Sequence, residues 1–149
     1  MARDIILNPA ISLDGFICDE DGGFAWIGGQ GDSRADTVDH FDFDAFLTSC
    51  DTIVMGRKAY EDCFSSLPEA AEKRFLVASR TPRAPEGNVV FLSADVVSEV
   101  LALKDRPGKH IWLFGGGELA SDFIRADAVD RYIVGILPVI RGRGRRLFQ

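Results

Sequence analysis

The chain has 149 residues, of which 46% are hydrophobic and 27% are charged, and this composition is typical of one soluble globular domain. Its 17 Lys and Arg against 23 Asp and Glu give a formal net charge of −6, which disfavours nucleic acid and anionic membranes as partners. No apolar stretch has the length of a signal peptide or a transmembrane helix. Three cysteines without a C-x-x-C pair and only two histidines predict reduced thiols, a cytoplasmic location and no metal site.

Six apolar segments, most of them nearly continuous, predict strands. Helical patterns lie between them, with Asp42 and either Ser93 or Asp95 as N-caps. This alternation predicts an α/β domain with a mostly parallel central sheet flanked by helices on both faces. The last strand has no helix after it, so an antiparallel direction is open to it. The strands are expected at 4–12, 51–56, 74–79, 88–93, 110–116 and 130–140, and the helices at 42–50, 57–64, 93–108 and 117–127.

Residues 12–36 form the longest stretch without a clear hydrophobic period. The stretch contains six glycines and several acidic residues, which predicts a long loop. Its large apolar side chains, Phe16 and Trp26 among them, argue against disorder. A loop packed down by its own aromatic side chains and a lid over a ligand are equally compatible with this composition.

Glycines at the end of the fifth predicted strand suit an anion site. Gly115, Gly117 and Ala120 match the G-x-G-x-x-G/A dinucleotide pattern, but they come too late in the chain for a Rossmann domain. A glycine-rich backbone that opens a helix still suits a phosphate group, and we expect a positive φ at Gly116. The alternative is a tight strand-to-helix turn without a ligand.

Basic and hydroxyl side chains follow two other predicted strands. Arg57 and Lys58 stand where a helix begins, a position that opposes the helix dipole unless an anion binds there. Ser79, Arg80 and Thr81 form a hydroxyl-guanidinium cluster suited to a phosphate monoester. Each group is alternatively a solvated surface or an ordinary turn. All of these groups fall at carboxyl ends of predicted strands, where open α/β sheets bind ligands.

The chain resembles the dihydrofolate reductase-like superfamily, most closely the C-terminal reductase domain of the bifunctional riboflavin-biosynthesis deaminase/reductase. The resemblance implies one such domain over residues 1–149, with NADPH bound across the strand ends. Relatives usually continue past the final "LF" with two further strands, so we expect the C-terminal strands to be missing here. The matching stretches are "AISLDGFI", "FLTSCDTIVMGRKAYE", "LVASRTP", "IWLFGGGELASDFIRADAVDRYIVGILPVI" and "LF".

The resemblance also implies which residues contact the cofactor. Ala10 and Ile11 would meet the nicotinamide, while Ser79 and Arg80 would receive the 2′-phosphate and favour NADPH over NADH. The remaining contacts would hold the phosphates of the cofactor and come from Gly56, Arg57, Lys58, Gly115, Gly116, Gly117, Glu118 and Leu119.

The substrate side is less defined. Asp14 and Asp42 are the candidate catalytic carboxylates, and Asp14 and Trp26 are the candidate substrate contacts. Asp36 is a further acidic residue in the region that would face the substrate. Each has a structural alternative: Asp42 as an N-cap, Asp14 as an organiser of its own loop, and Trp26 as the anchor of that loop.

Two functions remain open. The first is an NADPH-dependent reductase that transfers a hydride to a small heterocyclic substrate resembling a riboflavin precursor or a pterin. The second is a non-catalytic nucleotide-binding or assembly module on the same scaffold. An unpaired edge strand predicts a homodimer. Four arginines at 141, 143, 145 and 146 could touch RNA or a phosphorylated substrate, but against a net charge of −6 a solvated loop is the expectation.

Overall fold

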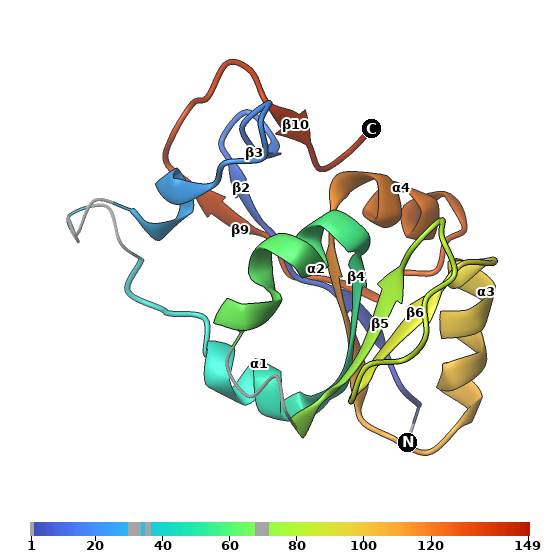
Figure 1. Ribbon diagram of the computed structural model, residues 1–149. Helices are drawn as coiled ribbons and strands as arrows, with labels where there is room; N and C mark the ends of the chain where they lie inside the picture. Colours follow the sequence, from blue (N-terminus) through green and yellow to red (C-terminus); the bar gives the residue numbers. More distant parts are fainter. Residues whose placement is uncertain (1, 30–33, 35–36, 68–71) are drawn as a thin grey trace.

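Six parallel strands in the order β6-β5-β4-β7-β1-β8 form the central sheet (Figure 1). The computed structural model describes residues 2–29, 34, 37–67 and 72–149. Because all six strands run in one direction, their carboxyl ends meet at a single edge of the sheet, where sites are expected. The strands are β1 Ile5–Leu7, β4 Cys50–Gly56, β5 Arg74–Ala78, β6 Val89–Leu92, β7 His110–Gly115 and β8 Arg131–Tyr132.

Helices cover both faces of this sheet, as predicted (Figure 1). Alternate strand residues point to opposite faces, so Ile53 packs in the cluster of Phe46 on one side and Val54 packs in the cluster of Phe123 on the other. The helices are α1 Phe43–Ser49, α2 Arg57–Cys63, α3 Val96–Leu101 and α4 Gly117–Arg125, with short 3₁₀ turns η1 Ala25–Gly28, η2 Phe64–Ser66 and η4 Ala102–Asp105.

Side-chain caps fix where two helices begin. Asp42 accepts a hydrogen bond of 2.9 Å from the backbone N–H of Ala45, as its N-cap position predicts. Asp95, rather than Ser93, caps α3 by accepting from the N–H of Ser98 at 3.2 Å.

The first and last predicted strands are each interrupted and run parallel to one another. Residues 4–12 divide into β1 and β2 (Ala10–Ser12), and residues 130–140 divide into β8 and β9 (Gly135–Leu137). Strand β8 pairs with β1, and β9 pairs with β2, both in parallel. The antiparallel option for the last strand is therefore wrong. Helix α4 carries the chain back to the starting edge of the sheet, so the next strand runs in the same direction as β7.

The residues after β9 fold back over residues 13–20, in the first part of the predicted loop. Two short strands, β3 (Phe16–Cys18) and β10 (Arg145–Arg146), pair antiparallel, which the sequence did not predict. We call residues 138–149 the C-terminal segment. Its Leu147 is only 2% exposed, within the core that lies under α3 and α4. Figure 1 shows β10 beside β3 and close to α4.

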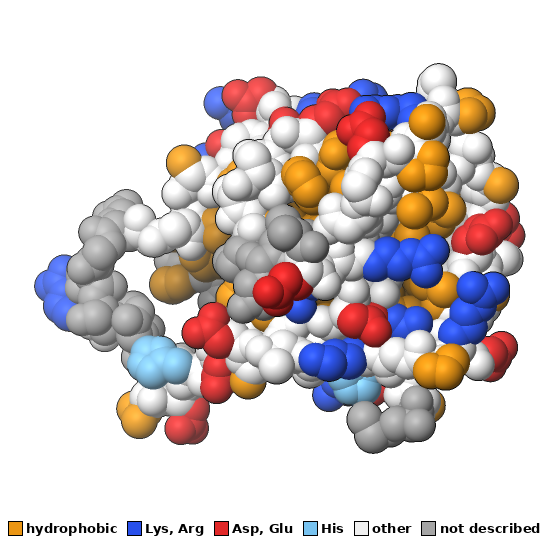
Figure 2. All heavy atoms as spheres, turned by 60° about the horizontal axis from the view of Figure 1, so that its bottom comes forward, with side chains coloured by type: hydrophobic (Ala, Val, Ile, Leu, Met, Phe, Trp, Pro, Cys, Tyr) orange, Lys and Arg blue, Asp and Glu red, His pale blue; other side chains and the backbone are white. Residues whose placement is uncertain are grey.

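At the opposite edge of the sheet, where the strands begin, the buried side chain of Arg3 joins neighbouring segments by hydrogen bonds. Arg3 donates to the carbonyl of Lys109 at 2.6 Å, to the hydroxyl of Thr52 at 2.9 Å and to the carboxylate of Asp51. Figure 2 turns this edge toward the viewer, and its acidic and basic side chains are interspersed. Among the described helices, none is both long and apolar enough to cross a membrane.

Candidate functional site

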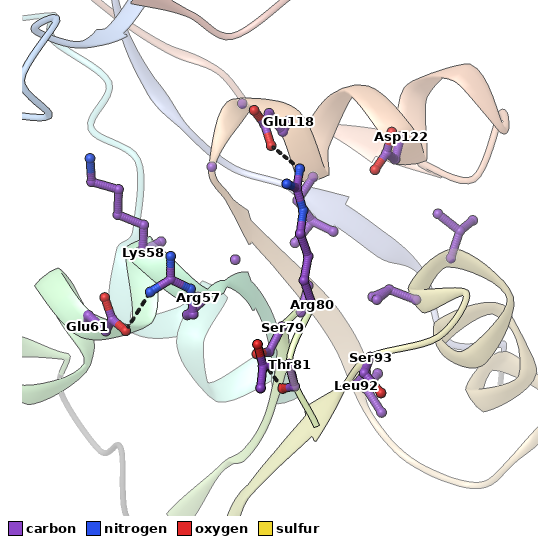
Figure 3. A pocket seen from close by; sticks show the side chains of 18 of the residues that line it. Arg57, Lys58, Glu61, Ser79, Arg80, Thr81, Leu92, Ser93, Glu118 and Asp122 are labelled. Carbon is purple, nitrogen blue, oxygen red and sulfur yellow. Dashed lines mark hydrogen bonds and ion pairs between the residues drawn. The ribbon is translucent and has the colours of Figure 1, made fainter. Parts of the chain in front are cut away.

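A cleft of about 1380 Å³ opens at the carboxyl edge of the sheet (Figure 3). It lies where β4, β5, β6 and β7 end and where α2, α3 and α4 begin. Most of the predicted cofactor residues line it, namely Gly56–Lys58, Ser79, Arg80 and Gly116–Leu119. Ala10, Ile11 and Gly115 do not line it: Ala10 and Ile11 lie on β2 beside β9, and Ile11 is buried. The fold therefore brings three distant stretches of sequence into one cleft.

The three glycines differ in whether their backbone or surroundings require a glycine. Gly115 has φ +108°, a backbone conformation that residues with a side chain rarely adopt, and it precedes a cis peptide bond. Gly116 has an ordinary φ of −68°, so the expected positive φ at this residue is wrong and belongs to its neighbour. Gly117 opens the nine-residue helix α4. A side chain there would meet the carbonyl of Arg146 at 2.8 Å.

The loop after β5 directs one guanidinium group into the cleft. Arg80 is 97% exposed and lies 3.9 Å from the carboxylate of Glu118 on α4, as Figure 3 shows. Ser79 is buried, and its hydroxyl donates to the carbonyl of Thr81 at 2.8 Å. The Glu118 side chain thus points to Arg80 across the cleft, while Ser79 orders the turn that carries Arg80.

The remaining basic groups of the cleft fall into two kinds. Arg57 pairs with Glu61 at 3.0 Å, and Arg83 pairs with Glu86 at 3.1 Å. Lys58 and Arg145 form no ion pair with any carboxylate of the described residues. Sequence reasoning missed Arg83, Arg145, Gln149 and residues 92–97 as lining residues. The end of the fourth predicted strand at 88–93 was the available indication for residues 92–97, because all parallel strands end at this edge.

Asp14 does not line the cleft and is held by hydrogen bonds. Its carboxylate accepts from the Ser12 hydroxyl at 2.6 Å and from the N–H groups of Gly142 at 2.8 Å and Arg141 at 3.1 Å. The Ser12 hydroxyl and these N–H groups lower the pKa of Asp14 to about 2. A group with this pKa is ionised at neutral pH and is not suited to donate a proton. This placement favours an anchoring role.

The other substrate-side candidates also have structural partners. Trp26 lies in η1, and the guanidinium of Arg141 is 5.4 Å from its ring centroid. Its indole Nε1 is buried without a hydrogen-bond partner in the described part of the chain. Asp42 caps α1. None of these residues lines the cleft, and Asp36 is outside the described residues.

The arginines of the C-terminal segment are mostly exposed, and three of them have partners in residues 14–20. Arg141 pairs with Asp19 at 2.6 Å, Arg145 donates to the carbonyl of Glu20 at 3.1 Å, and Arg146 donates to the carbonyl of Asp14 at 3.2 Å. The segment is solvated as expected, because Arg141, Arg143 and Arg146 are exposed, but residues 14–20, far away in sequence, supply acceptors that the sequence did not predict.

The RibD C-terminal domain family matches residues 3–149. The chain belongs to this family. Its relatives include the uncharacterized protein YwjB of Bacillus subtilis strain 168, which is 32% identical over the whole chain, with 84% of YwjB covered. The predicted resemblance is confirmed at the level of family.

Solved structures confirm the fold of this RibD C-terminal domain. A protein from Shewanella sp. PV-4 that is described as a riboflavin biosynthesis protein matches with a TM-score of 0.79 and 25% identity. The match covers 100% of this chain and 84% of the other. Dihydrofolate reductase from Enterococcus faecalis, solved with NADP(H), matches with a TM-score of 0.69 and 16% identity, over 100% of this chain and 80% of the other. The dihydrofolate reductase-like α/β fold is thus established.

Proposed function

We propose that this protein is an NADPH-dependent reductase that transfers a hydride to a small heterocyclic substrate resembling a riboflavin precursor or a pterin. The cleft carries this proposal, because it unites a glycine-rich helix start with basic side chains at the edge where α/β sheets bind nucleotides. Membership of the RibD C-terminal domain family supports it. The NADP(H) complex of the structurally similar dihydrofolate reductase supports the choice of cofactor.

The residues of the cleft fit the chemical groups of NADPH. The backbone of Gly116 and Gly117, at the positive end of the α4 dipole, would hold the pyrophosphate. Arg80 would pair with the 2′-phosphate, for which a guanidinium is well suited. Ala10 and Ile11 lie on β2 and do not line the cleft, and there they would meet the nicotinamide. The bound cofactor supplies the hydride, and the protein orients it and excludes water.

The second candidate, a non-catalytic nucleotide-binding or assembly module, is favoured by a specific observation. Among the described residues, neither candidate acid is free to donate a proton: Asp14 has a pKa lowered to about 2, and Asp42 caps a helix.

One experiment separates the two functions. NADPH binding is measured by calorimetry, and NADPH consumption is then followed with a panel of pterins, pyrimidines and riboflavin precursors. Steady consumption with one substrate class supports the reductase. Tight binding without turnover over the whole panel supports the module, and no binding of NADPH contradicts both.

We also propose that the protein forms a two-fold homodimer through its β8–β9 edge. Three apolar side chains on these strands or just after β9 are exposed: Tyr132 by 49%, Ile136 by 62% and Ile140 by 73%. The backbone of the edge strand has no further strand beyond it in the described sheet. A second copy would cover both the apolar side chains and the unpaired backbone groups.

A further inference from the structure

Two basic side chains without acidic partners converge on one side of the cleft. Lys58 comes from the first turn of α2, and Arg145 comes from β10 in the C-terminal segment. They flank Gly22: a methyl group built there would lie 3.7 Å from Arg145 Nη1 and 3.8 Å from Lys58 Nζ. Figure 3 shows Arg57 and Arg80 joined to carboxylates by dashed lines, whereas Lys58 extends past Arg57 without one.

The surroundings of the two groups leave their charges available to a ligand. Arg145 uses Nη2 to reach the carbonyl of Glu20, and its Nη1 has no acceptor among the described residues. Three carboxylates lie on the same loop, those of Asp19, Glu20 and Asp21, and none of the three is within ion-pair distance of Lys58 or Arg145. Asp19 is held by Arg141 at 2.6 Å, and Asp21 accepts from the N–H of Gly23 at 3.0 Å.

Strand pairing and hydrogen bonds hold Arg145 in position. Its strand pairs with β3, where Arg145 lies opposite Cys18. On either side of it, Gly142 donates to Asp14 at 2.8 Å and Leu147 donates to the carbonyl of Gly15 at 3.2 Å. Arg145 is thus half-buried and ordered before any ligand arrives, which lowers the entropy cost of binding.

The same side of the cleft holds the glycine-rich helix start. The C-terminal segment contacts Gly117 through the Arg146 carbonyl and the Gln149 side chain. Strand β4, which leads to Lys58, lies between β5 and β7 in the sheet, and a side chain at Gly56 would lie 3.8 Å from the Gly116 nitrogen. Arg80 belongs instead to the β5 end of the cleft.

We propose that Arg145, together with Lys58, binds the pyrophosphate of the dinucleotide beside the Gly116–Gly117 backbone. The inference rests on the proposed function, because it names a further binding residue of the same cleft. Two cations would face the two phosphate charges, while the helix start binds them through N–H groups. Since the pyrophosphate is common to NADPH and NADH, Arg145 contributes equally to both, unlike Arg80.

The test compares NADPH and NADH affinity by calorimetry in the wild type, Arg145→Ala and Arg143→Ala. Arg143 lies in the same segment, is exposed and does not line the cleft, so it controls for loss of one positive charge. We expect Arg145→Ala to weaken both cofactors by the same factor, about tenfold for a lost charge-assisted hydrogen bond, and Arg143→Ala to change neither appreciably. Arg145→Lys should restore part of the loss.

Other outcomes overturn the inference in distinct ways. If Arg145→Ala binds both cofactors as tightly as the wild type, Arg145 does not bind the pyrophosphate. If only NADPH affinity falls, Arg145 contacts the 2′-phosphate instead. An equal loss in Arg143→Ala would show a general effect of charge. If Arg145→Ala does not fold, Lys58→Ala on the exposed start of α2 must show the same equal loss. A wild-type protein that binds neither cofactor refutes the proposed function itself, whereas normal wild-type binding with unaffected variants refutes only this inference.

Discussion

Replacing Arg80 with alanine tests how the cleft distinguishes NADPH from NADH. In the free protein this side chain is 97% exposed, and its contact with Glu118 is long, at 3.9 Å. Such exposed pairs contribute about 0–1 kcal/mol, so the melting temperature should hardly change. With NADPH bound, the variant loses a charge-assisted hydrogen bond to the 2′-phosphate, which costs about 1–3 kcal/mol. NADPH should therefore bind roughly 5- to 150-fold more weakly, while NADH affinity stays the same.

Calorimetric titration of both cofactors measures this change directly. Arg83→Ala is the matched control, because Arg83 also lines the cleft but is held over the Phe91 ring at 4.1 Å and paired with Glu86. We expect the control to retain the preference for NADPH. Glu118→Gln should strengthen NADPH binding, since it removes a negative charge beside the 2′-phosphate and frees Arg80. Equal affinity of the wild type for NADPH and NADH, or an unchanged preference in Arg80→Ala, would refute the assignment of Arg80.

Three further predictions concern the C-terminal segment and the sheet edge. Leu147→Ala should lower the free energy of unfolding by about 2–4 kcal/mol, because it leaves a cavity in the core, while Phe148→Ala at an exposed neighbour should lower it far less. Urea denaturation measures both variants, and an equal loss of stability would contradict the burial of Leu147 in the core. Asp14→Asn should destabilise the protein at neutral pH. Because folding lowers the pKa of Asp14 from 3.8 to about 2, the carboxylate stabilises the fold fully above pH 3.8 and loses this effect as the pH falls toward 2. The unfolding curves of the wild type and the variant should therefore converge in acid. Ile136→Asp should convert the proposed dimer to a monomer in light scattering, and a wild type that is monomeric at every concentration would refute the dimer.

Local patterns determined most of the central sheet and its helices. The apolar run before Gly56 and the run before Gly115 predicted β4 and β7, because strands covered on both faces need nearly continuous apolar residues. Asp42 capped α1 as expected, since an N-cap acts within its own turn. The location of the cleft was also predicted, because parallel strands end at one edge and the glycines and basic residues that follow them therefore lie together there.

Tertiary structure decided the features that depend on residues far apart in the sequence. Strands β3 and β10 are too short to show a period, and they form only because Cys18 and Arg145 are brought together by the fold. The partners of Asp14 and of the arginines could not be predicted for the same reason, since they lie more than 100 residues away in the sequence. Which glycine takes the positive φ also depended on how the end of β7 meets α4. The sequence alone therefore determined most of the central sheet, and the edge that carries the cleft, through local periodicity. Long-range hydrogen bonds, which no local pattern encodes, placed the C-terminal segment against that edge.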